Sequence, residues 1–90
     1  MIRTIKETSA FRRDVKRAGK RRKDMAKLLA IVEALATDKT LEPKHRPHPL
    51  TGDWRPSWEC HIEPDWLLIY QVHDEYVELI RTGTHADLFR

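Results

Sequence analysis

The sequence has little of what secreted, membrane-spanning or nucleotide-binding proteins usually contain. Its one cysteine, Cys60, cannot form a disulfide within the chain, and a free thiol is typical of a reducing compartment. No apolar run approaches bilayer-spanning length, and the N-terminus has no apolar core of a signal peptide. The chain also contains no Gly-rich phosphate loop and no Gly-x-Ser-x-Gly motif. These absences predict a cytoplasmic protein with no membrane association.

Charge is unevenly distributed along the chain. Residues 1–46 contain 14 lysines and arginines against 6 acids, whereas residues 47–90 contain 3 against 8. A basic half of this strength predicts a polyanionic partner, nucleic acid first and an acidic protein segment second. Ninety residues bury only one modest core, so we expect one domain over residues 1–90 and no cofactor.

The N-terminal half has the hydrophobic spacing of two helices. A short strand fits residues 2–6, and a first helix follows Ser9 and stops at Gly19. A second helix fits residues 22–37, with Asp24 near its positive end. The Gly-containing break between them predicts a helical hairpin.

The C-terminal half has the pattern of strands. Residues 38–56 hold four of the five prolines and are predicted to form a loop. Strands are expected at residues 58–62, 67–72 and 77–82, and Thr84 with Asp87 resembles a capping box for a short C-terminal helix. The order β-α-α-β-β-β predicts an α+β fold, with the helical hairpin packed on a small, mainly antiparallel sheet.

Two tight hairpins would fix which side chains share a face. They would pair His61 with Leu68 and Leu68 with Arg81, so that His61 and Arg81 lie in one row, two strands apart. A slip of one residue in either hairpin would destroy this alignment. The expected apolar face, which receives the helices, consists of Trp58, Cys60, Ile62, Leu67, Ile69 and Ile80.

The candidates for acid–base chemistry are three histidines and an aspartate. Imidazole titrates near neutrality, so it can both take and give a proton. RNA cleavage needs both acts: a base removes the ribose 2′-OH proton, and an acid protonates the departing 5′-oxygen. The candidates are His48, His61, Asp65 and His85.

Each candidate also has a structural interpretation. A single histidine more often serves as a surface or hydrogen-bonding residue, the only role assigned to His45 and His73, and Asp65 suits the turn after Pro64. A metal site is disfavoured, because no spacing among the candidates matches a zinc signature such as His-Glu-x-x-His.

Other side chains are suited to holding RNA. The Arg81 guanidinium suits a phosphate clamp, although an edge-strand arginine can serve solubility alone. Trp66 and Phe89 belong either to the core or to base-stacking surfaces. A basic run on the first helix would track phosphates, although such a run is usually a solvated face. Its members include Arg12, Arg13, Lys16 and Arg17.

Three segments, in this order, resemble one known family over nearly the whole chain. They are the His-Pro-Leu-x-Gly-x-Trp block at residues 48–54, the His-x-Glu-Pro-Asp-Trp block from His61, and the Arg-Thr-Gly-Thr-His-Ala block from Arg81. Together they are similar to the YafQ-type branch of the RelE/ParE toxin superfamily, and residues 20–25 fit the same branch. Other RelE-like toxins use lysine, arginine and tyrosine, so the histidine-rich set indicates this branch.

The resemblance implies a RelE-like fold with a four-stranded sheet and a metal-free mRNA endoribonuclease that acts on translating ribosomes. It places the catalytic positions on His48, His61, Asp65 and His85, with His85 as general acid and Asp65 or His61 as base. It links Trp66, Arg81 and Phe89 to RNA binding or activity.

The resemblance also implies partners. They are a cognate antitoxin of the DinJ kind, the ribosome with its mRNA, and operator DNA bound through the antitoxin. Two other functions stay open from the sequence: a ParE-like inhibitor of gyrase, and a non-catalytic RNA-binding module in which the basic helices do the work.

Overall fold

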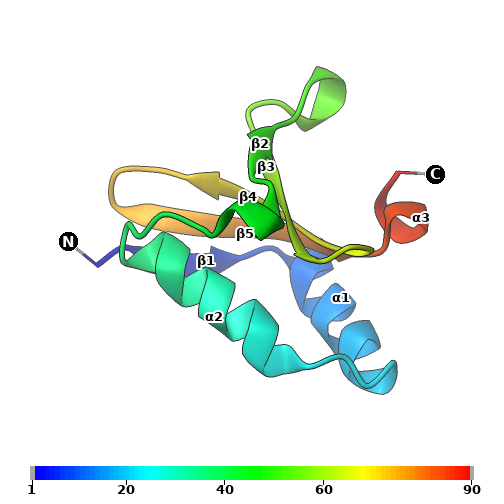
Figure 1. The fold of residues 1–90 in the computed structure, drawn as a ribbon. Helices are drawn as coiled ribbons and strands as arrows, with labels where there is room; N and C mark the ends of the chain where they lie inside the picture. The colour runs from blue at the N-terminus through cyan, green and yellow to red at the C-terminus, as the bar shows by residue number, and fades with distance from the viewer. Residues whose placement is uncertain (1, 90) are drawn as a thin grey trace.

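The structure is a computed structural model that describes residues 2–89. Two helices pack on one face of an open sheet, and a short third helix lies beside the end of the sheet (Figure 1). The α+β class and the predicted order of the main elements are confirmed. The elements are β1 (Thr4–Glu7), α1 (Ser9–Lys20), α2 (Met25–Ala36), η1 (Pro43–His45), β2 (His48–Pro49), η2 (Gly52–Trp54), β3 (Trp58–Glu63), β4 (Trp66–Val72), β5 (Tyr76–Gly83) and α3 (His85–Leu88).

The ends of the two long helices follow from their caps. The Thr8 hydroxyl accepts the Phe11 N–H and caps α1, one residue before the predicted position. The prediction that Gly19 ends this helix is wrong, because α1 continues to Lys20. Arg22 has a φ of 60°, which interrupts the helix, so α2 begins later than predicted. Asp24 caps α2 by accepting the Ala26 N–H, in agreement with its predicted place.

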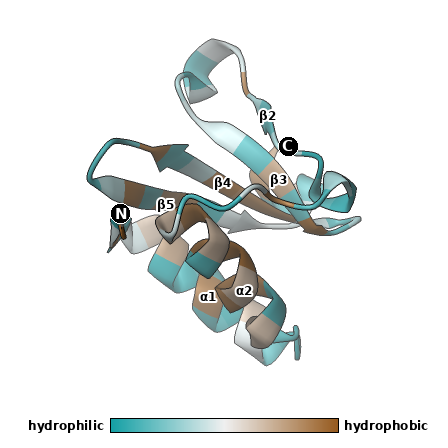
Figure 2. Ribbon diagram, turned by 60° about the vertical axis from the view of Figure 1, so that its left-hand side comes forward, coloured by the Kyte–Doolittle hydropathy of each residue, from teal (hydrophilic) through white to brown (hydrophobic). Residues whose placement is uncertain are grey.

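The core lies between this helical hairpin and the sheet. Phe11 and Ala18 of α1 face the sheet, and α2 contributes the apolar side of its three turns. Figure 2 shows the apolar stretch of β4 running through the middle of the sheet beside these helices. Among residues 2–89, no helix is long and apolar enough to cross a membrane. The helix-side core consists of Phe11, Ala18, Leu28, Ile31, Val32, Leu35, Cys60, Ile62, Trp66, Leu68, Tyr70, Val77 and Leu79.

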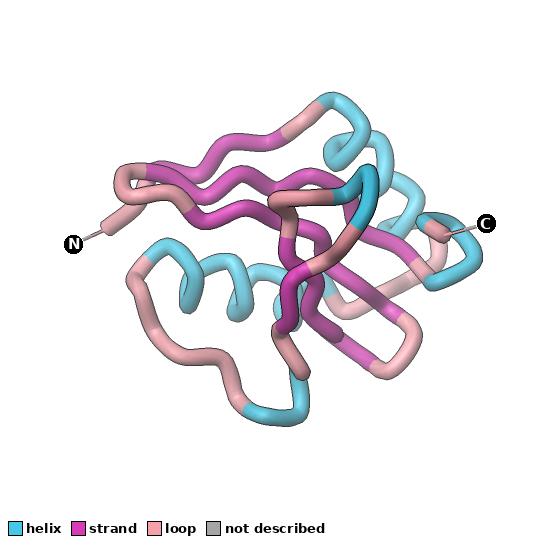
Figure 3. The backbone as a smooth tube through the Cα atoms, turned by 90° about the horizontal axis from the view of Figure 1, so that it is seen from above, coloured by secondary structure: helices cyan, strands magenta, loops and turns pink. Residues whose placement is uncertain are grey.

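Within residues 2–89, the sheet has the order β1-β5-β4-β3-β2, with β1 and β5 parallel and the other pairs antiparallel. Seen from above, β3, β4 and β5 run side by side, while the long connection from α2 crosses to the far edge (Figure 3). The connection expected over residues 38–56 contains two short 3-10 turns and the two-residue strand β2. The sheet therefore has five strands where the resemblance implied four.

The predicted register is confirmed beside both turns, where Glu63 pairs with Trp66 and Val72 with Val77, but it is wrong by one residue farther along each hairpin. His61 lies opposite Leu67 instead of Leu68, and Arg81 lies opposite Ile69. The pairing shifts between His61 and Glu63, and again between Ile69 and Tyr70. A bulge of this kind inverts the alternation of side chains along the paired strand. His61 and Arg81 consequently do not lie in one row, and the Arg81 side chain binds Asp14 of α1.

The shifts create a second, smaller apolar cluster on the face away from α1 and α2, which we call the open face. Leu67, Ile69 and Ile80 were expected to meet the helices, yet they lie in this cluster. Leu88 of α3 packs on them, as does Trp54 of η2. The cluster fixes α3 and the η2 loop over one end of the open face.

Candidate active site

Three of the predicted histidines gather on the open face, at the edge formed by β2 and β3. His61 lies within β3, and β2 places His48 opposite Glu59. The ring centroids of His48 and His61 are 6.4 Å apart, and those of His61 and His85 are 5.7 Å apart. Side chains that are 37 positions apart in the chain therefore form one cluster.

His85 is held by the predicted aspartate. Its backbone N–H donates to Asp65 Oδ1 at 2.9 Å, and its ring Nδ1 lies 2.6 Å from the same oxygen. The hydrogen bond from the His85 backbone N–H lowers the pKa of Asp65 below its usual range, and the hydrogen bond with the His85 ring lowers it further. Both side chains remain accessible to solvent, at 52% for His85 and 65% for Asp65. The pair is thus oriented and open to a substrate.

The position of His85 depends on the cap of α3. The Thr84 hydroxyl accepts the Asp87 N–H at 3.1 Å, and the Asp87 carboxylate accepts the Thr84 N–H at 3.0 Å. This reciprocal pair is the predicted capping box, with aspartate in place of glutamate. It places His85 at the first position of the helix, beside the β3–β4 turn that contains Asp65.

Glu59 is a member of the cluster that the sequence prediction missed. Its side chain is only 8% exposed, and its Oε1 lies 3.4 Å from His61 Nε2 and 3.7 Å from His48 Nε2. A buried carboxylate is costly unless it is paired, so its place between two imidazoles indicates a shared function. The available signal was the spacing of two residues between Glu59 and His61, which puts both on one face of a strand.

The cluster also has the composition of a metal site. Glu59, His61 and His85 each offer one ligand atom, and these atoms lie within 4.8 Å of one another. Imidazole nitrogens with one carboxylate oxygen suit zinc, copper or nickel. The three residues have no recognisable spacing in sequence because the sheet and α3 bring them together.

A model of one toxin family matches residues 3–90. It describes a bacterial toxin of a type II toxin–antitoxin system, YafQ. This chain belongs to the YafQ family. The mRNA interferase toxin YafQ of Escherichia coli K12 is 42% identical to it over 88 residues, which cover 97% of this chain and 96% of that protein.

Solved structures of family members have the same fold. The crystal structure of the E. coli DinJ–YafQ toxin–antitoxin complex matches with a TM-score of 0.92 and 41% identity, covering all of both chains. A metal-bound toxin from Helicobacter pylori matches with a TM-score of 0.90 and 38% identity, covering 99% of this chain and all of the other. The sequence blocks identified the family correctly.

The two aromatic residues predicted for RNA binding have different environments in this YafQ-family chain. Trp66 is 1% exposed, packs in the helix-side core and donates its indole N–H to the Thr82 hydroxyl. Of the two interpretations that the sequence left open for Trp66, the structure supports the core, because its ring is buried and not exposed for stacking on a base. Phe89 is 39% exposed and makes an edge contact with Trp54 at 5.6 Å, so it remains accessible from the open face.

The basic side chains also separate into two groups. Arg12, Arg13 and Lys16 are exposed on α1. Arg17 instead contacts Asp14 and Asp87, and Arg81 binds Asp14 through two hydrogen bonds of 2.6 and 3.1 Å. The two arginines are thus committed to carboxylates within the protein.

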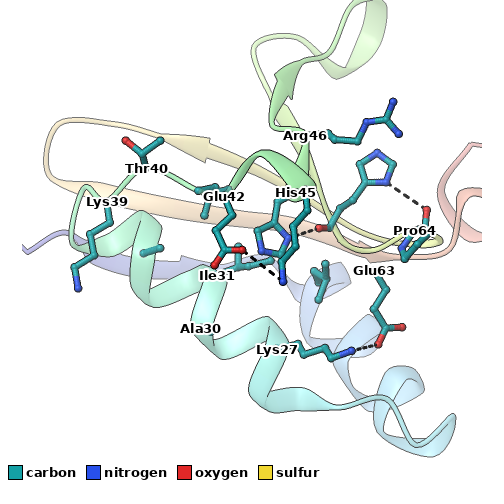
Figure 4. A pocket seen from close by; sticks show the side chains of 15 residues that line it. Lys27, Ala30, Ile31, Lys39, Thr40, Glu42, His45, Arg46, Glu63 and Pro64 are labelled. Atoms are coloured by element: carbon teal, nitrogen blue, oxygen red, sulfur yellow. Dashed lines mark hydrogen bonds and ion pairs between the residues drawn. The ribbon is translucent and has the colours of Figure 1, made fainter.

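A groove of about 690 Å³ adjoins the cluster and shares His61 with it. It lies between α2, the 39–46 connection and β3, and Figure 4 shows its lining from close by. Its lining includes the buried side chains of Ile31 and Ile62 and the exposed Arg46. On the same side, the His45 ring bonds the His61 carbonyl at 2.7 Å and holds the connection against β3. The groove offers apolar surface and positive charge next to the histidines.

Proposed function

We propose that this chain is an mRNA endoribonuclease, as its E. coli relative is named, and that it cleaves by acid–base chemistry without a metal. The observation that carries the proposal is the gathering of His48, His61 and His85 with Asp65 and Glu59 at one accessible edge. Such a set can remove the 2′-OH proton and protonate the departing 5′-oxygen around one phosphodiester.

His85 is the general acid in this proposal. With Nδ1 held by Asp65, its Nε2 is the ring atom left to give a proton to the 5′-oxygen. Asp65 keeps the ring oriented and stabilises its charged form. A positioned acid of this kind contributes about 10²–10⁴ in rate.

His61 is the general base. A base works best when its pKa lies near the working pH, and the lowered pKa of Asp65 makes that carboxylate a weak proton acceptor. The Glu59 carboxylate, 3.4 Å from His61 Nε2, stabilises the imidazolium that forms when His61 takes the 2′-OH proton. His48 lies on the other side of Glu59 and adds a donor for a phosphate oxygen.

The assignment of the base predicts two different pH profiles. In His61→Gln, the cleavage rate should no longer rise with pH on the acid side of the profile, because the group whose deprotonation causes that rise has been removed. Asp65→Asn should lower the rate at every pH while both sides of the profile remain. The reverse pattern would assign the base to Asp65.

RNA binding and partners complete the proposal. Arg12, Arg13 and Lys16 of α1 give attachment to phosphates, Phe89 stacks on a base, and the groove beside His61 receives nucleotides that flank the cleavage site. The substrate is mRNA on translating ribosomes in the bacterial cytoplasm. A DinJ-like antitoxin neutralises the toxin, and the complex binds operator DNA through that antitoxin.

Mapping mRNA 5′ ends after a brief pulse of expression tests the function. Wild type should produce new ends within coding regions, and His85→Ala should produce none while still binding antitoxin. DNA-damage signalling with intact mRNA would instead indicate a gyrase inhibitor. An RNA-binding module would instead arrest translation without cleaving mRNA. His85→Ala would then still arrest translation, and substitution of Arg12, Arg13 and Lys16 would abolish the arrest.

A metal ion on Glu59, His61 and His85 is a second candidate role for the cluster, favoured by their mutual distances. A metal-bound and a copper-bound toxin from H. pylori are among the similar structures. An ion there would occupy the rings that the acid–base proposal needs free, so copper or zinc should inhibit cleavage and a chelator should restore it. Activation by the ion would overturn the metal-free mechanism.

A further inference from the structure

A chain of alternating charges connects α1 to the end of β5 and to α3. Asp14 accepts two hydrogen bonds from Arg81 at 2.6 and 3.1 Å and one from Arg17 at 2.9 Å. Arg17 also lies 3.3 Å from Asp87, which accepts from Arg21 at 2.7 and 3.3 Å. The order is Arg81, Asp14, Arg17, Asp87, Arg21, with each carboxylate between two arginines.

The two carboxylates of this chain are shielded from water. The Asp14 side chain is 1% exposed and also accepts the Thr82 backbone N–H at 3.1 Å. The Asp87 side chain is 12% exposed, although it belongs to a surface helix. Ion pairs that are shielded and shared in a network hold geometry better than isolated surface pairs do.

Helix α3 depends on such contacts because it is short. Four residues form about one turn, which is not stable in water without tertiary packing. Its contacts with the rest of the protein include Leu88, packed on Leu67 and Ile69, and Asp87, held by Arg17 and Arg21. His85 lies two residues before Asp87 in the same turn. The direction of its ring toward Asp65 therefore follows the placement of Asp87.

Gly83 is part of the same arrangement. A Cβ built on Gly83 would lie 2.9 Å from Asp87 Oδ2 and 3.0 Å from Asp87 Cβ. A side chain at this position would push Asp87, and α3 with it, away from β5. The missing side chain thus allows the close approach on which the pairing with Arg21 depends.

We propose that Arg17 and Arg21 are positioning residues for His85, acting through Asp87 to hold α3 in place, and that they do not bind RNA. The effect on cleavage rests on the proposed function, whereas the effect on His85 geometry does not. The basic run of α1 then has two roles: Arg12, Arg13 and Lys16 face solvent, while Arg17 and Arg21 face the carboxylates.

Two substitutions test the proposal in different ways. Arg21→Gln removes the charge that holds Asp87, and Arg12→Gln is its matched control on the exposed side of α1. Gly83→Ala displaces Asp87 without changing any charge. Gly19→Ala is its control, because a Cβ there meets no atom within 4 Å.

Nuclear magnetic resonance of the free toxin measures the position of His85 directly. In wild type, the His85 backbone N–H donates to Asp65, and this bond should slow its exchange with water. Arg21→Gln and Gly83→Ala should each raise that exchange rate about tenfold and shift the His85 ring signals, while the two controls leave both unchanged. The proposal is overturned if Arg21→Gln and a folded Gly83→Ala both leave the amide exchange rate and the ring signals of His85 at their wild-type values. This outcome does not depend on whether the wild-type protein cleaves RNA.

Cleavage on programmed ribosomes separates positioning from RNA contact. Arg21→Gln should lower kcat about tenfold to a hundredfold with KM unchanged, since small displacements of a reacting group cost this much. Arg12→Gln should raise KM and leave kcat unchanged. A raised KM with an unchanged kcat for Arg21→Gln would show that Arg21 contacts RNA and would overturn the proposal. Should Gly83→Ala fail to fold, Arg21→Gln alone carries the test, because its side chain lies outside the core.

Discussion

The two faces of the sheet use the same strands but differ in what they carry: one is mainly apolar, whereas the other carries acid–base groups beside a smaller apolar cluster. On the helix side, α1 and α2 cover a continuous apolar core. On the open face, α3 and the η2 loop pack on a smaller apolar cluster, and Glu59, His61 and the neighbouring histidines lie beside it. The comparison teaches that the acid–base groups gather on the face of the sheet that α1 and α2 do not cover.

Adjacent residues of β3 show the difference most directly. Cys60 is fully buried under the helices, and burial, helped by the Glu59 charge, raises the pKa of its thiol to about 12. It therefore stays protonated and unreactive at neutral pH. His61, the next residue, points to the open face and lies beside Glu59. One step along the strand thus separates an inert core thiol from a catalytic candidate.

The largest expected effect comes from truncating the two buried leucines of β4 that face opposite sides. Leu68→Ala and Leu67→Ala each remove a side chain that is inaccessible to solvent, and each should cost about 2–5 kcal/mol of unfolding free energy. Folded Leu68→Ala should retain its cleavage rate. Leu67→Ala should lose rate as well, because Leu88 of α3 packs on Leu67.

Urea denaturation and single-turnover cleavage measure these two effects. Equal cleavage rates for the two folded variants would show that the histidine cluster of the open face does not depend on the apolar cluster beside it. The comparison between the faces would then break down.

Glu59→Gln should affect activity more than stability. It keeps the shape of the side chain but removes the charge between His48 and His61. The attraction between an imidazolium and a carboxylate at about 4 Å is about 1–4 kcal/mol between bulk water and a protein surface, so the cleavage rate should fall about tenfold to a hundredfold. Single-turnover kinetics would measure this, with Glu63→Gln, at the Lys27 ion pair, as control. A rate equal to wild type would remove Glu59 from the site.

Asp87→Asn should weaken the folded state by about 1 kcal/mol at pH 7. The Arg21 guanidinium and the Thr84 backbone N–H hold the pKa of Asp87 well below its usual range. Because the pKa of Asp87 is lower in the folded protein than in the unfolded chain, its ionised carboxylate stabilises the fold. This stabilisation is complete above the ordinary pKa of about 3.9 and is lost as the pH falls below that value. The stability difference between wild type and Asp87→Asn should therefore shrink from pH 5 toward pH 2. Urea titrations at several pH values would reveal a constant difference if the charge plays no part.

The smallest expected effect comes from the rim of the groove. Arg46→Ala removes an exposed cation near His61 and should raise KM for cleavage a few-fold, with kcat and stability unchanged. Lys20→Ala, on the exposed side of α1 and away from the groove, is the matched control for loss of one charge. A weaker affinity for antitoxin in Arg46→Ala, with KM unchanged, would assign the groove to the antitoxin instead of RNA.

The order of the main elements, the approximate positions of both long helices and the capping box of α3 could be predicted from sequence because each depends on neighbouring residues. Helical spacing, the Asp24 cap and the Thr84–Asp87 pair all lie within one or two turns of chain. The three sequence blocks also identified the toxin family. The sequence placed His61, Asp65 and His85 among the candidates from chemistry and resemblance together.

The register and its consequences could be decided only by the tertiary structure. Side chains alternate along a strand with a period of two, so a single bulge reverses which face each one occupies. The shifts near His61 and Ile69 moved Leu67 and Ile69 to the open face. Local sequence does not encode contacts between residues far apart in the chain, such as Asp14 with Arg81 or Arg17 with Asp87. For that reason, the burial of Trp66 and these ion pairs emerged only from the fold. The spacing of Glu59 and His61 puts both on one strand face, but only the fold showed Glu59 buried between two imidazoles.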